Sequence, residues 1–323
     1  MKKWKRGIRV KKENKFQKPS VMIGLAIVCT LLWGSAFPCI KTGYGMFQIA
    51  AEAAGSQMLF AGIRFTIAGI MTILVSLCLE KEQYWEKRIT RKNVLGILLM
   101  GLIQTCLQYV FYYIGMAHVT GVKGAILNGT SAFLSVLTAR LFYKNQEKLS
   151  KGKWMGCVIG LLGVVIVNLG KGELGDGFTL LGEGFMLMAA IASALGALTT
   201  KEVSKGIAPV TLCGWQLGFG GILLIVLGTL LGGEMDWQNA GIKGIFLLMY
   251  MSFISAAAFA IWTILLKYNR MGQVTVFKFL VPVFGTLLSA LFLGDNIWNP
   301  YILAALPLVC VGIYLVNRQG KSE

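Results

Sequence analysis

The chain is poor in charged residues, which make up 14% of its 323 residues, whereas hydrophobic residues make up 56%. Soluble domains carry about 25% charged residues and about 45–50% apolar residues. A soluble protein of this composition would have to expose more apolar surface than solubility allows. The scarcity of charge therefore excludes an ordinary soluble globular protein.

Residues that carry acid–base or metal chemistry are also scarce. The chain has a single histidine, His118, and of its 14 acidic residues only Glu183 falls inside an expected membrane span. The seven cysteines form no C-x-x-C pair and lie in apolar runs, which favours packing residues over metal ligands or disulfides. No cluster of acids and no serine with a nearby base is present. We therefore expect no metal, no cofactor and no enzymatic activity.

The chain contains a series of apolar stretches. Most of them are close in length to the about 20 residues that a helix needs to cross a bilayer. The connections between them are short and leave no room for a soluble domain. The sequence predicts an all-α integral membrane protein with ten transmembrane helices. We place these helices at about 20–40, 56–79, 93–116, 124–143, 153–169, 180–200, 210–232, 242–266, 274–293 and 301–316.

The chain has a net charge of +17, and the positions of its basic residues agree with the expected topology of these spans. Cytoplasmic loops collect Lys and Arg, and with the N-terminus inside, most of the 31 basic residues fall on the inner side. We therefore expect a multi-pass protein of the cytoplasmic (inner) cell membrane with both termini inside. Residues 1–19 form a basic cytoplasmic tail suited to anionic lipid headgroups. The tail has only two aromatic residues and no folded module, so we expect no nucleic-acid partner.

The two halves of the chain resemble each other. Residues 131–133 in the fourth span match residues 282–284 in the ninth span. Because each half has five spans, the second half must enter the membrane upside down. We predict a first five-helix repeat over residues 20–170 and a second, inverted repeat over residues 178–318. Such repeats are typical of secondary transporters, whose substrate site lies near the midplane between the repeats.

Several short motifs also follow one another in a characteristic order. The first span carries LLWGSAF at residues 31–37, the second carries Arg64 followed by Phe, and residues 147–150 read EKLS. Together with LGD at residues 293–295, these motifs resemble those of EamA-type carriers, ten-helix members of the drug/metabolite transporter superfamily. The chain departs from that pattern at Ser131, where proline is common, and in LGD, where glutamate is usual. The resemblance implies transport by alternating access, commonly export of amino acids, metabolites or toxic compounds.

These observations predict a secondary transporter that moves a small polar metabolite, an amino acid or related compound, in the export direction. A proton relay is not expected, because the centres of the spans contain no Asp, Glu or His. Facilitated diffusion or exchange is therefore favoured. Two alternatives stay open: broad-specificity efflux of drugs or toxic compounds, and a non-carrier pore or lipid scramblase. The expected partners are a small-molecule substrate and membrane lipids, and the protein is expected to be a monomer or a homodimer.

Polar and aromatic side chains inside the spans are the candidate substrate ligands, because polar groups are costly in hydrocarbon. Gln104, Gln108 and Tyr112 share one helical face, and they suit either a polar substrate or hydrogen bonds between helices. Lys278 either pairs with a substrate carboxylate or phosphate or extends to the membrane surface. Tryptophans in the spans suit either a cavity wall or packing and interfacial anchoring. The predicted substrate-binding residues are Trp33, Gln104, Gln108, Tyr112, Asn128, Trp262 and Lys278.

Four further residues are predicted to act in gating or structure. Arg64 lies about 12 Å deep in the second span, which favours a fixed contact over substrate binding. Pro38 and Pro282 each remove a helix hydrogen bond and favour kinks that serve as hinges. Glu183, near the outer end of the sixth span, is interpreted as an acid stabilised at a helix start by the helix dipole. A role of Glu183 in ion coupling is the less favoured alternative.

Overall fold

The computed structural model describes residues 15–80, 91–143, 150–168, 179–294 and 300–317. Within these residues the regular secondary structure is helical, without β-strands. Eight helical stretches of the described chain are long and apolar enough to cross a membrane. The prediction of an all-α membrane protein is therefore confirmed. The basic tail up to residue 14, the motif at residues 147–149 and Asp295 lie outside the described residues.

The helices follow the order of the predicted spans. The third, sixth and ninth spans are each divided into segments of different helical geometry, and α7 and α13 take the places of the fifth and tenth spans. The elements are η1 Lys15–Gln17, α1 Pro19–Met46, α2 Ala54–Leu79, α4 Arg91–Met100, η2 Gly101–Leu107, α5 Gln108–His118, α6 Gly121–Phe142, α7 Lys151–Asn168, η3 Leu180–Gly184, α8 Phe185–Val203, α9 Pro209–Leu230, α10 Trp237–Tyr268, α11 Met271–Thr275, η4 Val276–Phe279, α12 Leu280–Leu293 and α13 Pro300–Asn317.

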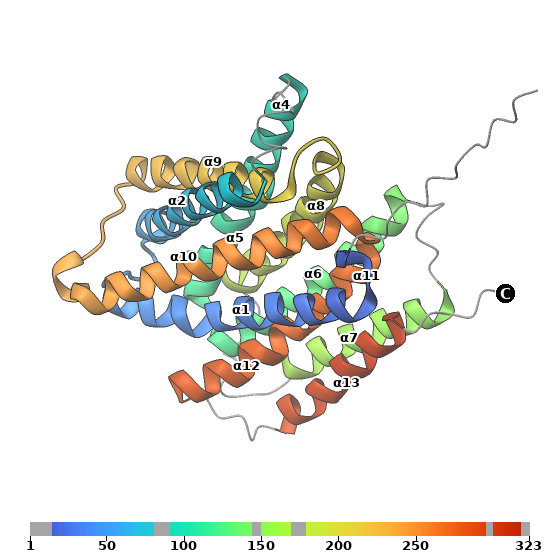
Figure 1. Ribbon diagram of the computed structural model, residues 1–323. Coiled ribbons are helices and arrows are strands. Elements are labelled where there is room, and N and C mark those ends of the chain that lie inside the picture. The colour runs from blue at the N-terminus through green and yellow to red at the C-terminus, as the bar shows by residue number, and fades with distance from the viewer. Residues whose placement is uncertain (1–14, 81–90, 144–149, 169–178, 295–299, 318–323) are drawn as a thin grey trace, which may run out of the picture.

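The pairing of these helices shows the two-repeat organisation. Helix α2 packs along α9, and α7 packs along α13, so equivalent helices of the two halves lie side by side (Figure 1). Helix α1 packs against α12, and α6 packs against α8. Exchanging the two halves converts the first of these pairs into the second. The packing is therefore nearly unchanged by the exchange, as expected for repeats related by a pseudo-two-fold axis.

Glycines allow α2 and α9 to approach closely. A Cβ atom on Gly69 would lie 2.4 Å from the backbone nitrogen of Gly218, and one on Gly221 would lie 2.5 Å from that of Thr66. Any larger residue at these positions would collide with the backbone of the neighbouring helix. Small residues at helix contacts are the usual means of close packing in membranes. This contact joins the two halves along much of the length of both helices.

The third, sixth and ninth spans contain segments of other helical types, and α10 has a kink at Gly241 near its start. The third span contains the π-helical segment η2, and the sixth span begins with the π-helical segment η3. The ninth span consists of α11, the 3-10 segment η4 and α12. π-Helical segments frequently mark functional sites, and discontinuous membrane helices line the substrate sites of transporters. Two of these irregular segments, η2 and η4, carry residues that were predicted to bind substrate.

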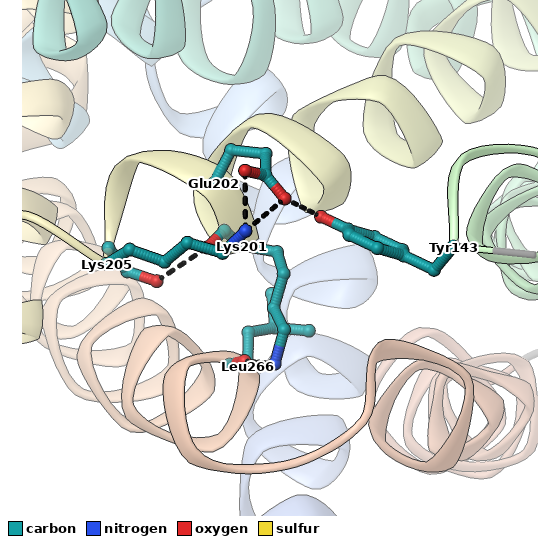
Figure 2. A network of polar contacts seen from close by, with 6 residues as sticks. Tyr143, Lys201, Glu202, Lys205 and Leu266 are labelled. Atoms are coloured by element: carbon teal, nitrogen blue, oxygen red, sulfur yellow. Dashed lines mark hydrogen bonds and ion pairs between the residues drawn. The ribbon is translucent and has the colours of Figure 1, made fainter. Parts of the chain in front are cut away.

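A network of polar contacts ties together the ends of α6, α8 and α10 (Figure 2). Glu202 accepts hydrogen bonds from the hydroxyl of Tyr143 and from the Lys205 ammonium, the latter at 2.7 Å. Lys201 donates to the carbonyl oxygens of Leu266, at 2.7 Å, and Asn269. Glu202 and Lys205 are exposed to solvent, so their ion pair contributes little to stability. The network connects the ends of three helices on one side of the bundle.

Candidate substrate site

A cavity lies between helices of both repeats, with an empty volume of about 660 Å³ including the space at its opening. All seven residues predicted to bind substrate line this cavity, together with Arg64. The full lining is Trp33, Ala36, Phe37, Arg64, Gln104, Gln108, Tyr109, Tyr112, Asn128, Ser131, Ser193, Ala197, Phe259, Trp262, Lys278 and Val281.

One wall of the cavity is aromatic. The rings of Trp33 and Trp262 meet edge to face with centroids 4.9 Å apart, and Phe259 contacts Trp33 in the same manner at 5.4 Å. Trp262 is buried. The indole nitrogen of Trp33 is also buried, yet it has no hydrogen-bond acceptor among the described residues. The wall therefore combines an apolar surface with one N–H donor that the described protein leaves unused.

Lys278 contributes a positive charge to the cavity. It lies in η4, at the interruption of the ninth span, and only 8% of its surface is exposed. Its ammonium donates a hydrogen bond of 2.9 Å to the hydroxyl of Ser193 on α8 and lies 5.9 Å from the ring centroid of Trp262. A cation at this distance from an aromatic face is attracted by the π-electrons. Of the two orientations considered from the sequence, the side chain has the one that faces the cavity.

The polar face of the third span also lines the cavity. The side-chain oxygen of Gln104, within η2, accepts a hydrogen bond of 2.6 Å from the hydroxyl of Thr200 on α8. Gln104 therefore makes a contact between helices and lines the cavity at once, so the two interpretations of its amide are compatible. Gln108 and Tyr112 follow on α5, and the ring of Tyr112 contacts Phe37 with centroids 6.0 Å apart. Amide and phenol groups thus stand next to the aromatic wall.

Arg64 is held by the protein itself. It is 2% exposed, its Nε donates to the hydroxyl of Ser255 at 2.9 Å and the carbonyl of Met251 at 3.1 Å, and its Nη1 donates to the hydroxyl of Tyr113 at 2.8 Å. These contacts connect α2 with α5 and α10. The geometry is that of a fixed contact between helices, the interpretation that the depth of Arg64 in the second span favours.

The charge of the cavity is positive. Arg64 and Lys278 are both in the lining, whereas no aspartate or glutamate is among the described residues that form it. Buried charges interact more strongly than exposed ones, because the surrounding dielectric is low and counterions are excluded. The cavity is therefore suited to a group that brings negative charge, and it disfavours a cation.

The three other residues predicted to act in gating lie outside the lining. Pro38 is buried within α1, which continues through it, whereas Pro282 lies in the first turn of α12. Pro282 has no N–H to donate to the carbonyl four residues earlier, and this coincides with the change from η4 to α12. Glu183 forms a buried ion pair with Lys123 and accepts a hydrogen bond of 2.7 Å from the backbone of Thr179. Glu183 thus occupies a helix start, as interpreted from the sequence.

Several important partners were missed from the sequence. Ser193, Tyr113 and Ser255, which hold the two cations, were not predicted, and neither was the pairing of Lys123 with Glu183. Ser193 and Ser255 stand in runs of alanine and other small residues, which read as packing surface. A serine among alanines on a buried helix is the signal that was available, because a lone hydroxyl there faces another polar group in many membrane proteins.

A helical membrane fold of two repeats with a cavity between them is the architecture of secondary transporters. Comparison with known proteins gives the same class. The model of the EamA-like transporter family matches the chain twice, over residues 20–169 and 180–318. The chain belongs to the EamA-like transporter family, and the resemblance noted from its motifs is confirmed.

Individual relatives cover most of the chain. The uncharacterized transporter YoaV of Bacillus subtilis is 27% identical over 91% of this chain and 96% of its own length. The uncharacterized transporter sll0355 of Synechocystis is 24% identical over 94% of this chain and 92% of its own. One solved crystal structure is similar with a TM-score of 0.73 at 18% identity, covering 94% of this chain and 98% of that one. This last similarity shows the fold alone.

Proposed function

We propose that the protein moves a small polar metabolite, an amino acid or related compound, across the cytoplasmic membrane by alternating access. One observation carries the proposal: seven side chains chosen for their chemistry converge on one cavity between the two repeats. A site at the interface of inverted repeats becomes accessible to either side when one repeat moves against the other. Export is the direction proposed, with both termini on the cytoplasmic side.

The lining supports a solute that is small and polar on one side. Gln104, Gln108 and Asn128 offer amide donors and acceptors, and Tyr112 offers a phenol group. The neighbouring aromatic wall can cover a carbon skeleton. Ligand sites usually combine an apolar surface with a few polar groups that fix orientation.

Facilitated diffusion or exchange is the proposed mode of transport. A proton-coupled carrier needs a group in the site that changes charge during the cycle, usually Asp, Glu or His. The described lining has none of these residues, and Glu183 is paired with Lys123 away from the cavity. A concentration gradient or an exchanged solute therefore supplies the driving force.

Counterflow in proteoliposomes tests this proposal. Vesicles containing the purified protein are preloaded with one unlabelled solute from a panel of amino acids, purines and sugars, and entry of the same labelled solute is followed. A carrier gives saturable entry that transiently exceeds equilibrium. Flux that neither saturates nor shows counterflow would indicate a pore and contradict the proposal, as would lipid movement without solute transport.

Two neighbouring positions on the third span provide a matched control. Gln108→Leu replaces a cavity amide, whereas Leu107→Met changes a side chain that is 44% exposed on the outer surface of the bundle. We expect Gln108→Leu to raise the KM for the solute and Leu107→Met to leave it unchanged. Fusion of a fluorescent protein to the C-terminus, which fluoresces only when it folds on the cytoplasmic side, tests the proposed topology.

A further inference from the structure

We propose that Lys278, Ser193 and Trp33 form an anion subsite within the cavity, and that the transported solute carries a carboxylate. This inference rests on the proposed transport function and names the substrate class for the same site. It follows from the hydrogen-bond donors that remain unused and from the charges of the lining.

The ammonium of Lys278 is only partly compensated by the described protein. An ammonium has three N–H donors and no acceptor, and Ser193 takes one of them at 2.9 Å. The ring of Trp262 attracts the ammonium through its π-electrons, but it does not neutralise the positive charge as an anion would. A buried charge without an ionic partner is costly. An anion in the cavity would remove that cost by pairing with the ammonium.

Trp33 supplies a second donor to the same wall. An indole N–H can only donate, and that of Trp33 is buried without an acceptor in the described part of the chain. Its ring packs against Trp262, the ring over which the Lys278 ammonium lies. Trp33 and Lys278 both line the cavity, and a carboxylate, which accepts hydrogen bonds on two oxygens, offers one acceptor to each.

The second cation of the lining limits the charge of the anion. Arg64 directs its Nε and Nη1 at Ser255, Met251 and Tyr113, so these donors are already engaged. These contacts fix the guanidinium between helices, and its charge adds to the positive potential of the cavity. We assign direct pairing to Lys278, whose one acceptor in the described protein is the hydroxyl of Ser193. One ammonium suits the single charge of a carboxylate better than the double charge of a phosphate ester, which usually recruits several cationic donors. A cationic drug would face two positive charges and no carboxylate of the described lining.

Thermal stability of the purified protein tests the subsite without requiring transport. The probe is acetate, the smallest organic carboxylate, with acetamide as its neutral counterpart of similar shape, at constant ionic strength. We expect acetate to raise the temperature at which half the protein survives heating, and acetamide to have no effect. Lys278→Gln should weaken the apparent acetate affinity at least about tenfold, which corresponds to about 1.4 kcal/mol. Trp33→Phe, which keeps a ring but removes the N–H, should weaken it by a smaller factor.

Lys205→Gln is the matched control, because it removes one positive charge from the exposed end of α8, outside the cavity. It should retain the response to acetate. Equal stabilisation by acetate and acetamide, absence of any acetate effect, or an undiminished effect in folded Lys278→Gln would each overturn the subsite. Methyl phosphate is a further probe: stronger stabilisation by it than by acetate would overturn the assignment to carboxylates. The counterflow experiment tests transport, whereas the heat-stability experiment tests binding of acetate. A negative result in one therefore contradicts only the proposal that it tests.

Discussion

Two buried cations line the same cavity, and their surroundings differ. Arg64 has three acceptors in the described protein, from α5 and α10, whereas Lys278 has one hydroxyl and an aromatic face. The first cation is therefore anchored by three protein acceptors, whereas the second has one. The comparison teaches that burial and charge alone do not identify a binding residue. What matters is whether the protein or a ligand supplies the acceptors.

The difference also separates the two repeats. Their helices pack in nearly equivalent ways, but the charges are placed on helices that are not equivalent: Arg64 on the second helix of its repeat, Lys278 on the fourth of the other. The symmetry of the fold is thus not shared by the site. An asymmetric site fits a solute whose two ends differ, such as one with a carboxylate at one end and a carbon skeleton at the other.

The largest expected effect is the loss of stability in Arg64→Met. The change removes charge-assisted hydrogen bonds that are worth about 1.5–3 kcal/mol each, and it leaves the hydroxyl of Tyr113 buried without that donor. We expect a loss on the order of 3–5 kcal/mol, because three such hydrogen bonds are lost together and a buried hydroxyl is left without its donor. Size-exclusion chromatography after a temperature series measures it.

Arg64→Lys is the companion variant. It keeps the charge but cannot reproduce the planar donors of a guanidinium, so partial recovery of stability is expected. If Arg64→Met were as heat-stable as the wild type, the contacts of this arginine would not be structural, and the contrast with Lys278 would be lost.

A smaller loss is expected for Tyr113→Phe. This variant removes only the hydroxyl that accepts from Arg64 Nη1 and should cost about 1–3 kcal/mol, because the donor left behind is buried. Tyr112→Phe is the matched control, one residue along α5 in the cavity lining. It should leave stability nearly unchanged and alter solute affinity instead. Equal heat stability of the two variants would contradict the assignment of Tyr113 to the arginine.

The membrane spans and the depth of Arg64 were predictable, because apolar runs of sufficient length and the positions of basic residues are local features of the sequence. The direction of Lys278 was not. It depends on η4, and a short break in a helix leaves no periodic signal. Its partner Ser193 lies 85 residues away in the sequence. Contacts of this kind arise from the packing of whole helices, and no local pattern in the sequence indicates which helices pack together.

The residues that were predicted to bind substrate converge on one cavity for a simple physical reason. Polar groups in a membrane protein avoid lipid, so side chains such as Gln104, Gln108 and Asn128 turn to the interior of the bundle. Polar residues selected from the spans are therefore mostly residues that lie in the interior of the bundle. The same logic did not separate the structural cation from the unpaired one, since that distinction depends on Tyr113 and Ser255.

Lys278→Met should act in the opposite direction to Arg64→Met. Lys278→Met removes the desolvation cost of a buried charge that has no carboxylate partner in the described lining, and only one hydrogen bond, to Ser193, is lost. We expect a gain of about 1 kcal/mol in the absence of solute, together with loss of transport in counterflow. The heat stability of both methionine variants, measured side by side, checks the sign. A destabilised Lys278→Met would place this lysine with Arg64 as a structural residue.

The smallest effect is expected for Ser193→Ala, which makes the same chemical change at Lys278 that Tyr113→Phe makes at Arg64: one hydroxyl acceptor is removed from a cation. Ser193 lines the cavity, where water can take its place, whereas Tyr113 is fully buried and is not part of the lining. A water-mediated contact is nearly as favourable as a direct one. We therefore expect a loss below about 1 kcal/mol for Ser193→Ala, smaller than that of Tyr113→Phe. Acetate should diminish this loss by pairing with the ammonium directly. Equal losses in the two variants, or a loss in Ser193→Ala that acetate does not reduce, would show that both cations depend on the protein alone.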